Sequence, residues 1–262
     1  MGILNVTPDS FSDGGKYLAV DKAVDYGLEM ISQGADIIDV GGESTRPGSK
    51  PVPLKEEIQR VIPVIRKLRA KSSTCISVDT YKSSLAWEAI TNGADIINDI
   101  SGFKFDPDMV NIVRETGALV ILMHIKGTPR HMQSNPHYDD LMSELTAYFG
   151  ERLDFAHGAG LNKNQIILDP GIGFGKRLED NFKIIRKLRQ IVDLGNPVLI
   201  GPSRKSFIGL TLNLPPDERV EGTAAAVTAG ILNGARIVRI HDVLEMKRVT
   251  IITDRIKGIP EA

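Results

Sequence analysis

The chain has 262 residues, 42% of them hydrophobic and 25% charged, so it can bury a full core and is neither disordered nor collagen-like. Lysine and arginine total 32 against 33 for aspartate and glutamate, giving a formal net charge of -1. This balance argues against nucleic acid or an anionic membrane as the main partner.

The compartment is predicted from three simple features. No apolar run approaches the roughly 20 residues of a membrane span. The opening residues carry no basic segment typical of a secretory signal. The only cysteine is Cys75, which excludes an internal disulfide and a cysteine-based structural zinc site. We therefore expect a cytoplasmic protein.

The elements in chain order begin with a short apolar run at residues 2–6 and a helical pattern from Val20 to Ile31. A phrase of glycine followed by an apolar run then recurs, and such a phrase is typical of a chain that leaves a helix and enters a buried parallel strand. Its four copies lie at residues 34–40, 93–99, 117–123 and 234–240.

Three more apolar runs, at residues 75–78, 166–168 and 197–200, complete a set of eight. Helical periodicity fills the segments between the runs, clearly so at residues 54–68 and 182–192. The sequence therefore predicts eight strands that alternate with eight helices.

Strict alternation demands a parallel sheet, and a count of eight without a break in composition favours closure into a (β/α)8 TIM barrel, an α/β fold. We expect residues 1–262 to form a single domain. An open dinucleotide-binding sheet is the weaker alternative, because it needs a tight Gly-x-Gly turn after its first strand and the chain has Thr7-Pro8-Asp9 there.

Functional groups of a parallel barrel lie at the C-terminal ends of its strands. Strands three, four and six end in carboxylates or amides, whereas strands seven, eight and one end in cations, histidine and amide. This division predicts a nitrogen-rich heterocycle that carries phosphate or diphosphate. In strand order the polar ends are Asn5, then Asp39 and Glu43, Asp79, Asn98 and Asp99, His124, Asp169, Ser203 to Ser206, and Arg239 and His241.

Two loops are long enough to act as lids. One runs from Thr7 to about Leu18 and the other from Gly41 to about Pro53. Unstructured loops of this length inside a compact domain are uncommon and usually functional. We expect them to order over a bound substrate and exclude water. They contain Asp9, Phe11 and Asp13 in the first, and Thr45, Arg46 and Pro47 in the second.

Structural roles remain open for several of these residues. Asp169 before Pro170 also suits an Asx turn. Asp79 and Asn98 also suit helix N-caps, because βα loops often end that way. Lys205 and its neighbour Arg204 also suit a solvated surface pair.

Other eye-catching residues favour structural readings. His124, His131 and His137 match no metal-ligand spacing. The run from Gly171 to Lys176 lacks the first glycine of a Walker A loop and has Arg177 where serine or threonine is required. We interpret it as backbone brought close to a flat ligand.

Packing roles are predicted for the two remaining residues of note. Cys75 is expected to be an inert core residue, because it lies in a buried strand. Trp87 is expected in the core rather than as a stacking platform, because apolar residues surround it in its helix.

Taken together, the motifs resemble those of the dihydropteroate synthases, folate-pathway enzymes that are inhibited by sulfonamides. The resemblance covers essentially the whole chain. It rests on Asn5 to Gly15, Asp39 to Gly48, Ser77-Val78-Asp79-Thr80, Asn98-Asp99, Asp169 to Lys176, Gly201 to Ser206, and Arg239-Ile240-His241-Asp242.

The resemblance implies that para-aminobenzoate is joined to hydroxymethyldihydropterin diphosphate, with release of diphosphate and a requirement for Mg²⁺. It implies the following residues: for the pterin Asp79, Asn98, Asp169, Phe174 and Lys205; for the diphosphate Asn5, Arg239 and His241, with Asn5 also on the metal; for para-aminobenzoate Phe11, Thr45, Pro47 and Ser206; and for catalysis Asp79, Lys205, Phe11 and Arg46. It also implies a homodimer.

The chemistry of these roles can be stated separately. A carboxylate at Asp169 can accept two N–H bonds from the aminopyrimidine edge of a pterin. Loss of diphosphate leaves positive charge on the pterin methylene, which the carboxylate of Asp79 stabilises most in the transition state. An aromatic amine is a modest nucleophile, so a dissociative displacement is expected, and no residue is assigned as a general base.

Two other functions remain as alternatives. One is a pterin-binding barrel that transfers a methyl group from methyltetrahydrofolate to a corrinoid protein. Such a barrel has no use for a diphosphate site, so Arg239 and His241 speak against it. The other is a non-catalytic pterin-binding paralogue, against which the presence of Asn5, Asp9, Phe11 and Arg46 in one chain argues.

Overall fold

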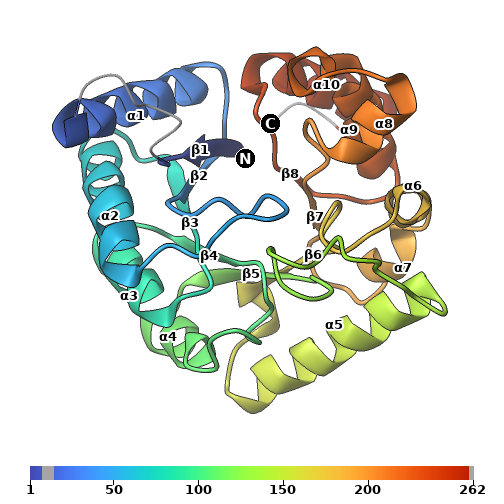
Figure 1. Ribbon diagram of the computed structural model, residues 1–262, viewed down its shortest axis with the longest axis horizontal. Helices are drawn as coiled ribbons and strands as arrows, with labels where there is room; N and C mark the ends of the chain where they lie inside the picture. The colour runs from blue at the N-terminus through green and yellow to red at the C-terminus, as the bar shows by residue number, and fades with distance from the viewer. Residues whose placement is uncertain (8–14, 260–262) are drawn as a thin grey trace.

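The computed structural model describes residues 1–7 and 15–259, and in this part of the chain eight parallel strands form a ring surrounded by helices (Figure 1). The strands are β1 (Gly2–Asn5), β2 (Ile37–Gly41), β3 (Cys75–Asp79), β4 (Ile96–Asp99), β5 (Leu119–Met123), β6 (Ile166–Asp169), β7 (Leu199–Ile200) and β8 (Ile237–Val238).

The ring closes through two narrow junctions. Strands β1 to β6 pair in sequence order, and β7 pairs with β8. A parallel bridge between Leu168 and Val198 joins β6 to the segment that leads into β7, and a second between Gly2 and Ile240 returns the chain to β1. The amide of Ile3 donates to the carbonyl of Ile240 at 3.0 Å. The predicted closed barrel is confirmed.

The helices follow the strands around the outside of the ring. In the described residues they are α1 (Gly15–Ser32), α2 (Leu54–Lys71), α3 (Ser83–Thr91), α4 (Met109–Thr116), α5 (Leu141–Gly158), α6 (Leu178–Arg186), α7 (Arg189–Val192), α8 (Ser206–Leu212), α9 (Val220–Leu232) and α10 (Val243–Ile256). Two 3₁₀ turns, Lys163–Gln165 and Pro216–Glu218, complete the set.

One predicted helix differs from the structure. The pattern at residues 182–192 is split into α6 and α7 at Lys187, which has φ of -107° and ψ of 19°. The buried positions Ile185, Leu188 and Ile191 recur every third residue. A three-residue spacing suits the tighter turns of a 3₁₀ conformation, and the amide of Ile191 donates to the carbonyl of Leu188.

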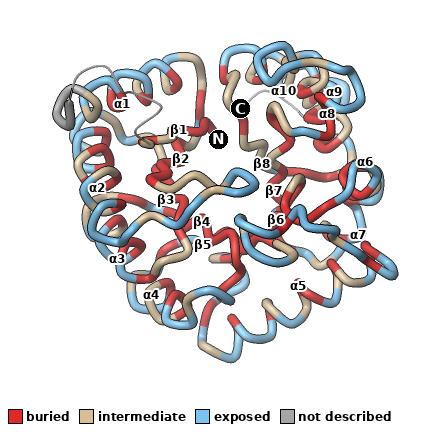
Figure 2. The backbone as a smooth tube through the Cα atoms, viewed as in Figure 1, coloured by how far each residue is buried: buried red, intermediate tan, exposed pale blue. Residues whose placement is uncertain are grey.

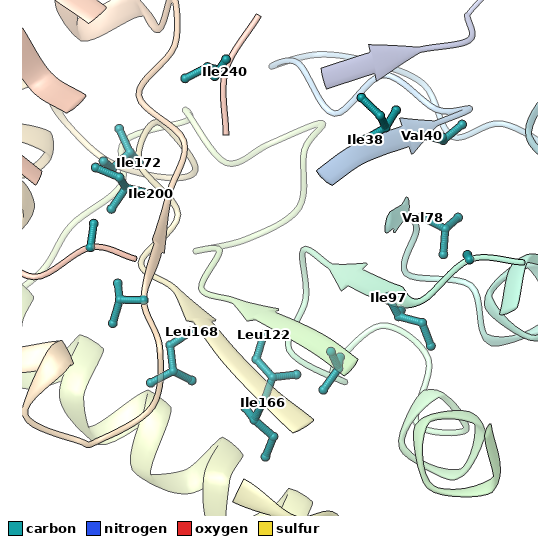
Figure 3. Packing of buried hydrophobic residues seen from close by; sticks show 14 of the residues in the cluster. Ile38, Val40, Val78, Ile97, Leu122, Ile166, Leu168, Ile172, Ile200 and Ile240 are labelled. Carbon is teal, nitrogen blue, oxygen red and sulfur yellow. The ribbon is translucent and has the colours of Figure 1, made fainter. Parts of the chain in front are cut away.

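The core has two shells, because strand side chains alternate between the two sides of the sheet. Ile38, Val40, Val78, Ile97 and Leu122 face outwards under the helices (Figure 3). The inward positions at the N-terminal end of the ring pack on one another. This inner cluster consists of Met1, Ile96, Ile121, Ile167 and Leu199.

The surface burial pattern corrects one expectation. Trp87 is 42% exposed, and Leu85, Ala86 and Ala89 form the buried face of α3 instead. The prediction of a core tryptophan was wrong because a short apolar helix has more apolar residues than its inner face can hold. Cys75 is partly buried and packs against the inner cluster, and burial raises the pKa of its thiol to about 11.

The other helices around the ring are also buried on one side only. Figure 2 shows helices buried on the side that faces the strands and exposed on the other. In the described part of the chain, no helix combines the length and apolar character needed to cross a membrane.

Candidate active site

Strand alternation also builds the mouth of the barrel. On four strands the inward positions that continue above the inner cluster are polar: Asp39 on β2, Asp79 on β3, Asn98 on β4 and Asp169 on β6. The pocket at this end of the ring is lined by Thr45, Asp79, Asn98, Ile100, Met123, Asp169, Ile172, Phe174, Gly201, Lys205 and Arg239. Asp169 and Arg239 therefore open into one pocket, within reach of one small ligand.

Arg239 spans the floor of this pocket. Its Nε donates to Asp39 Oδ2 at 2.6 Å and its Nη2 donates to Asp79 Oδ2 at 2.8 Å. Burial alone lowers the pKa of the guanidinium, but Asp39 and Asp79 outweigh that effect and raise it above its ordinary value. The sequence predicted acceptors on strands three, four and six and cations on strands seven and eight. The structure does not keep these two groups apart, because the Arg239 side chain is long enough to cross from the end of β8 to β2 and β3.

Neither Asp79 nor Asn98 caps a helix. Lys82 occupies the N-cap position of α3, without a side-chain cap. Asn98 Nδ2 instead donates to Asp39 Oδ2 at 3.2 Å. Burial raises the pKa of Asp79 above its ordinary value, and Arg239 opposes that shift. Both side chains line the pocket, as their predicted contact with a ligand requires.

Asp169 combines both roles that the sequence left open. Its Oδ1 accepts the amide of Gly171 at 2.7 Å, which is an Asx turn. Its Oδ2 has no hydrogen-bond partner among the described residues, and the side chain lines the pocket. Burial raises the pKa of Asp169 to about 6, against the lowering effect of the Gly171 amide.

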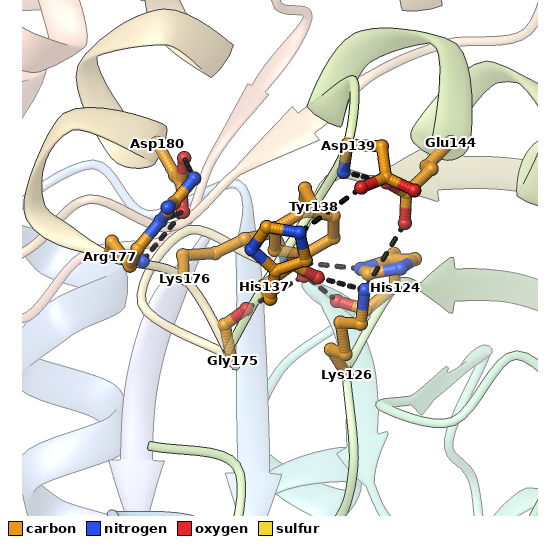
Figure 4. Close-up of polar contacts among 10 residues, drawn as sticks. All are labelled: His124, Lys126, His137, Tyr138, Asp139, Glu144, Gly175, Lys176, Arg177 and Asp180. Atoms are coloured by element: carbon orange, nitrogen blue, oxygen red, sulfur yellow. Dashed lines mark hydrogen bonds and ion pairs between the residues drawn. The ribbon is translucent and has the colours of Figure 1, made fainter. Parts of the chain in front are cut away.

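The loop after β6 is held by a buried lysine. Lys176 is 3% exposed, and its Nζ lies 3.0 Å from His124 Nδ1 (Figure 4). The same Nζ donates to the carbonyls of Phe174 and Gly171 at 2.9 and 3.2 Å. Gly171 has φ of 69°, and a Cβ there would lie 2.0 Å from the His124 carbonyl oxygen. The lysine is thus a structural clamp, which agrees with the rejection of a nucleotide loop.

Of the three histidines, His124 is buried, whereas His131 and His137 are exposed. No group of three or more metal-ligating side chains occurs in the described residues. His124 packs edge-on against Tyr148, and His137 lies 3.1 Å from Asp139 at the surface. His124 is buried beside Lys176, and burial followed by that charge lowers its pKa to about 2.

This burial predicts an acid-sensitive fold. Native His124 stays neutral, whereas the unfolded chain takes up a proton below about pH 6.5, so stability falls as the pH drops. Between pH 6.5 and 5, the unfolding free energy of the wild type is expected to lose on the order of 1 to 2 kcal/mol relative to His124→Asn. Urea unfolding of both proteins at each pH measures this difference, and parallel pH curves would contradict it.

Lys205 and Arg204 do not form a solvated pair. Arg204 is bound to Asp242, with Nε donating to Oδ2 at 3.0 Å. Lys205 turns into the pocket, where its Nζ lies 4.1 Å from the centroid of the Phe174 ring. Desolvation and then the Arg239 charge lower the pKa of Lys205 to about 8.

Two predicted site residues, Asn5 and His241, are not among the residues that line the pocket. A Cβ on Gly41 would lie 3.8 Å from Asn5 Oδ1 and 3.5 Å from Asp79 Oδ2, so both oxygens flank the same glycine. His241 Nδ1 lies 3.0 Å from Ser203 Oγ. Burial, followed by the Arg239 charge, lowers the pKa of His241 to about 4, so it is neutral at physiological pH.

The residues expected around para-aminobenzoate are less closely gathered. Thr45 lines the pocket, Arg46 and Pro47 are exposed on the loop after β2, and Ser206 is exposed at the start of α8. In Figure 1 this loop reaches over the ring. Phe11, with Asp9 and Asp13, lies outside the described residues.

Sequence reasoning missed the apolar walls of the pocket, formed by Ile100, Met123 and Ile172. Met123 packs with Phe174 and Ile100 in a small cluster. Apolar residues at strand ends look like core in a sequence. The one available signal was the alternation of side chains along β5, because Met123 lies two residues after Ile121 and therefore faces the inside of the barrel as well.

Comparisons with known proteins agree with this geometry. A family model described as pterin binding enzyme matches residues 1–241. The dihydropteroate synthase of Bacillus subtilis is 50% identical over 254 residues, covering 97% of this chain and 87% of that protein. The Yersinia pestis dihydropteroate synthase, solved with a sulfonamide drug, superposes with a TM-score of 0.93 at 42% identity, covering 98% of this chain and 94% of the other.

A third relative has been solved with small molecules of the expected kinds. The Xanthomonas albilineans dihydropteroate synthase with 4-aminobenzoic acid has a TM-score of 0.91 at 42% identity, and covers 99% of this chain and 93% of its own. The same enzyme has also been solved with 7,8-dihydropteroate. With the barrel and the pocket in place, the chain belongs to the pterin-binding enzyme family, among the dihydropteroate synthases.

Proposed function

We propose that this protein condenses para-aminobenzoate with hydroxymethyldihydropterin diphosphate to form dihydropteroate and free diphosphate, the activity of its family. The observation that carries the proposal is the single pocket that contains Asp169 and Asn98 together with Lys205 and Arg239. It offers acceptors for a pterin and cations for its diphosphate. We include in the proposal that residues 1–262 act as one domain, since the pocket uses side chains from β3 to β8.

The polar side chains that face the inside of the barrel bind the pterin. Asp169 Oδ2 accepts N–H groups from the aminopyrimidine edge, and this charge-assisted contact selects a ligand that presents two donors. Asn98 and Asp79 contact the ring beside it. Lys205 donates to the ring carbonyl, and Phe174 below it supplies an apolar face.

The diphosphate is bound by Arg239, His241 and Asn5. Arg239 already uses Nε and Nη2, while Nη1 has no hydrogen-bond partner among the described residues and can face a phosphate oxygen. The side-chain oxygen of Asn5 would hold the Mg²⁺, because hard cations of this kind prefer oxygen ligands. When bound, this metal neutralises charge that develops on the leaving group.

The reaction proceeds as a dissociative displacement at the pterin methylene. The carbon–oxygen bond to diphosphate breaks first, the aniline nitrogen then forms a bond to the methylene carbon, and the proton lost by that nitrogen passes to the released diphosphate. The carboxylate of Asp79 faces the electron-deficient pterin and stabilises it. Thr45, Arg46, Pro47 and Ser206 hold para-aminobenzoate over the methylene, together with Phe11, and exclude water.

Pterin affinity is expected to depend on pH through Asp169. Its carboxylate accepts ligand hydrogen bonds only when ionised, so the affinity for 6-hydroxymethylpterin falls as the pH drops below about 6. Loss of the Lys205 charge weakens binding above about pH 8. Fluorescence titration across this range measures both effects. In Lys205→Met, the loss of affinity above about pH 8 is expected to disappear, whereas the loss below about pH 6 is expected to remain. If affinity still falls above pH 8 in this variant, the role of Lys205 is contradicted.

A two-substrate assay tests the proposed reaction. We expect diphosphate release only when the pterin diphosphate, para-aminobenzoate and Mg²⁺ are all present. Binding of the pterin diphosphate without turnover on addition of para-aminobenzoate would favour the non-catalytic paralogue. Methyl transfer from methyltetrahydrofolate to a corrinoid acceptor would favour the other alternative.

We also propose that the protein is a homodimer that uses the outer faces of α8, α9 and α10, which lie together in Figure 2. Apolar side chains are exposed there, including Ile252 at 61% and Ile256 at 69%. We expect the double variant Ile252→Glu, Ile256→Glu to sediment as a monomer. Trp87→Glu, which changes an exposed apolar residue on α3, is the matched control. A wild-type monomer would contradict the proposal.

A further inference from the structure

Asp39 lies at the centre of the polar layer but cannot touch a ligand. It is fully buried and is not among the residues that line the pocket. Its side chain faces inwards from β2, beneath Asp79 and Asn98. Any influence of Asp39 on a substrate must therefore pass through its neighbours.

One oxygen of Asp39 serves two predicted substrate-binding residues. Oδ2 accepts Arg239 Nε at 2.6 Å and Asn98 Nδ2 at 3.2 Å. An amide that donates downwards from its nitrogen must present its oxygen in the other direction. Asp39 thus fixes Asn98 with its carbonyl oxygen available to an N–H group in the pocket. The same contact orients Arg239 so that its Nη2 reaches Asp79.

Stability does not explain this carboxylate well. Its other oxygen, Oδ1, is buried and has no hydrogen-bond partner among the described residues, and the same is true of Ser77 Oγ at the paired position on β3. A buried ionic group with an unsatisfied oxygen is costly, and replacement by an apolar residue is often neutral or stabilising. The two contacts made by Oδ2 are the remaining reason for an aspartate here.

We propose that Asp39 is a positioning residue that sets the donor and acceptor polarity of the pocket, acting on the pterin through Asn98 and on the diphosphate through Arg239. The inference rests on the proposed function and deepens it. A positioning role differs from a general structural role in what it predicts. It predicts which Asn98 variant loses pterin affinity and which substitution of Asp39 restores that affinity.

The first test compares two variants that leave Asp39 in place. Asn98→Ala removes the amide, whereas Asn98→Asp places a second carboxylate against Asp39. We expect Asn98→Asp to bind 6-hydroxymethylpterin roughly 10-fold or more weakly than Asn98→Ala, since like charges at this distance repel in a buried site. Equal affinities would overturn the proposal, and this comparison does not depend on whether an Asp39 variant folds.

The second test is a repair. Asp39→Asn alone is expected to weaken 6-hydroxymethylpterin binding roughly 10-fold, because the charged acceptor that orients Asn98 is lost. In the Asn98→Asp background the same change supplies an amide donor, so the double variant is expected to bind about 10-fold more tightly than Asn98→Asp. Unchanged binding by Asp39→Asn, or a further loss in the double variant, would overturn the proposal.

The diphosphate arm uses inorganic diphosphate with Mg²⁺ as the probe. Asp39→Asn is expected to weaken its binding several-fold, and to add little to the loss caused by Arg239→Met, because both changes act through one guanidinium. Fully additive losses would overturn the coupling. Asp180→Asn is the matched control: Asp180 is a buried aspartate that contacts Arg177 and does not line the pocket.

The outcomes also separate this inference from the proposed function. A wild-type protein that binds neither probe contradicts the proposed function. A wild-type protein that binds both, with Asp39→Asn binding equally well, contradicts only the role of Asp39.

Discussion

Asp169→Asn is expected to lower kcat/KM for the pterin diphosphate by about 100-fold, equivalent to about 3 kcal/mol. The substitution keeps the shape of the side chain. Its amide oxygen remains the natural acceptor for the Gly171 amide that now donates to Oδ1 at 2.7 Å. The amide NH2 of the asparagine therefore takes the place of Oδ2. It faces the N–H groups of the ligand, and no hydrogen bond can form between two donors.

The same variant is expected to fold at least as stably as the wild type. The pKa of native Asp169, about 6, lies above that of an unfolded aspartate, so its ionised form opposes folding at neutral pH. Steady-state kinetics and thermal unfolding measure the two effects separately. Asp180→Asn serves again as the control, with unchanged kcat/KM. A loss of activity below about 5-fold in Asp169→Asn would contradict the assigned pterin contact.

Arg239→Met is expected to damage both stability and activity. The guanidinium is the only cation that contacts both Asp39 and Asp79 in the described residues, and both carboxylates are buried. Removing one partner of a buried ion pair leaves uncompensated charge, which typically costs about 3 to 5 kcal/mol. The diphosphate loses its main cation at the same time.

Arg239→Lys is the informative companion to this variant. Lysine keeps the charge but is a single point donor that cannot hold two carboxylates and a phosphate at once. We expect it to recover most of the stability and little of the diphosphate affinity. Urea unfolding and calorimetric titration with diphosphate and Mg²⁺ measure these quantities. A stability loss below about 1 kcal/mol in Arg239→Met would contradict the ion-pair role.

The fold was predictable from sequence because its signals are local and repeated. Glycine followed by an apolar run marks four of the αβ connections, and eight copies of a βα unit leave few topologies. The errors occurred where a local pattern has two solutions. An apolar residue such as Trp87 on a short helix can face in or out, and spacing by three at Leu188 suits both α-helical and 3₁₀ turns.

The candidate site was predictable where a residue type at a strand end has few other uses. Asp169, Lys205 and Arg239 are of this kind, and the structure brings them into one pocket. The contacts between elements were not predictable. That Arg239 crosses the barrel to Asp39 depends on strand register and side-chain length, over a separation of 200 residues. The apolar walls at Met123 and Ile100 carry no sequence signal distinct from core.

One pocket is proposed to hold the pterin and its diphosphate as parts of one ligand. Calorimetric titration with 6-hydroxymethylpterin, inorganic diphosphate and the joined pterin diphosphate, each with Mg²⁺, examines this proposal. We expect the joined ligand to bind at least 100-fold more tightly than either half, because the second contact becomes intramolecular. A joined ligand that binds no more tightly than 6-hydroxymethylpterin would contradict it.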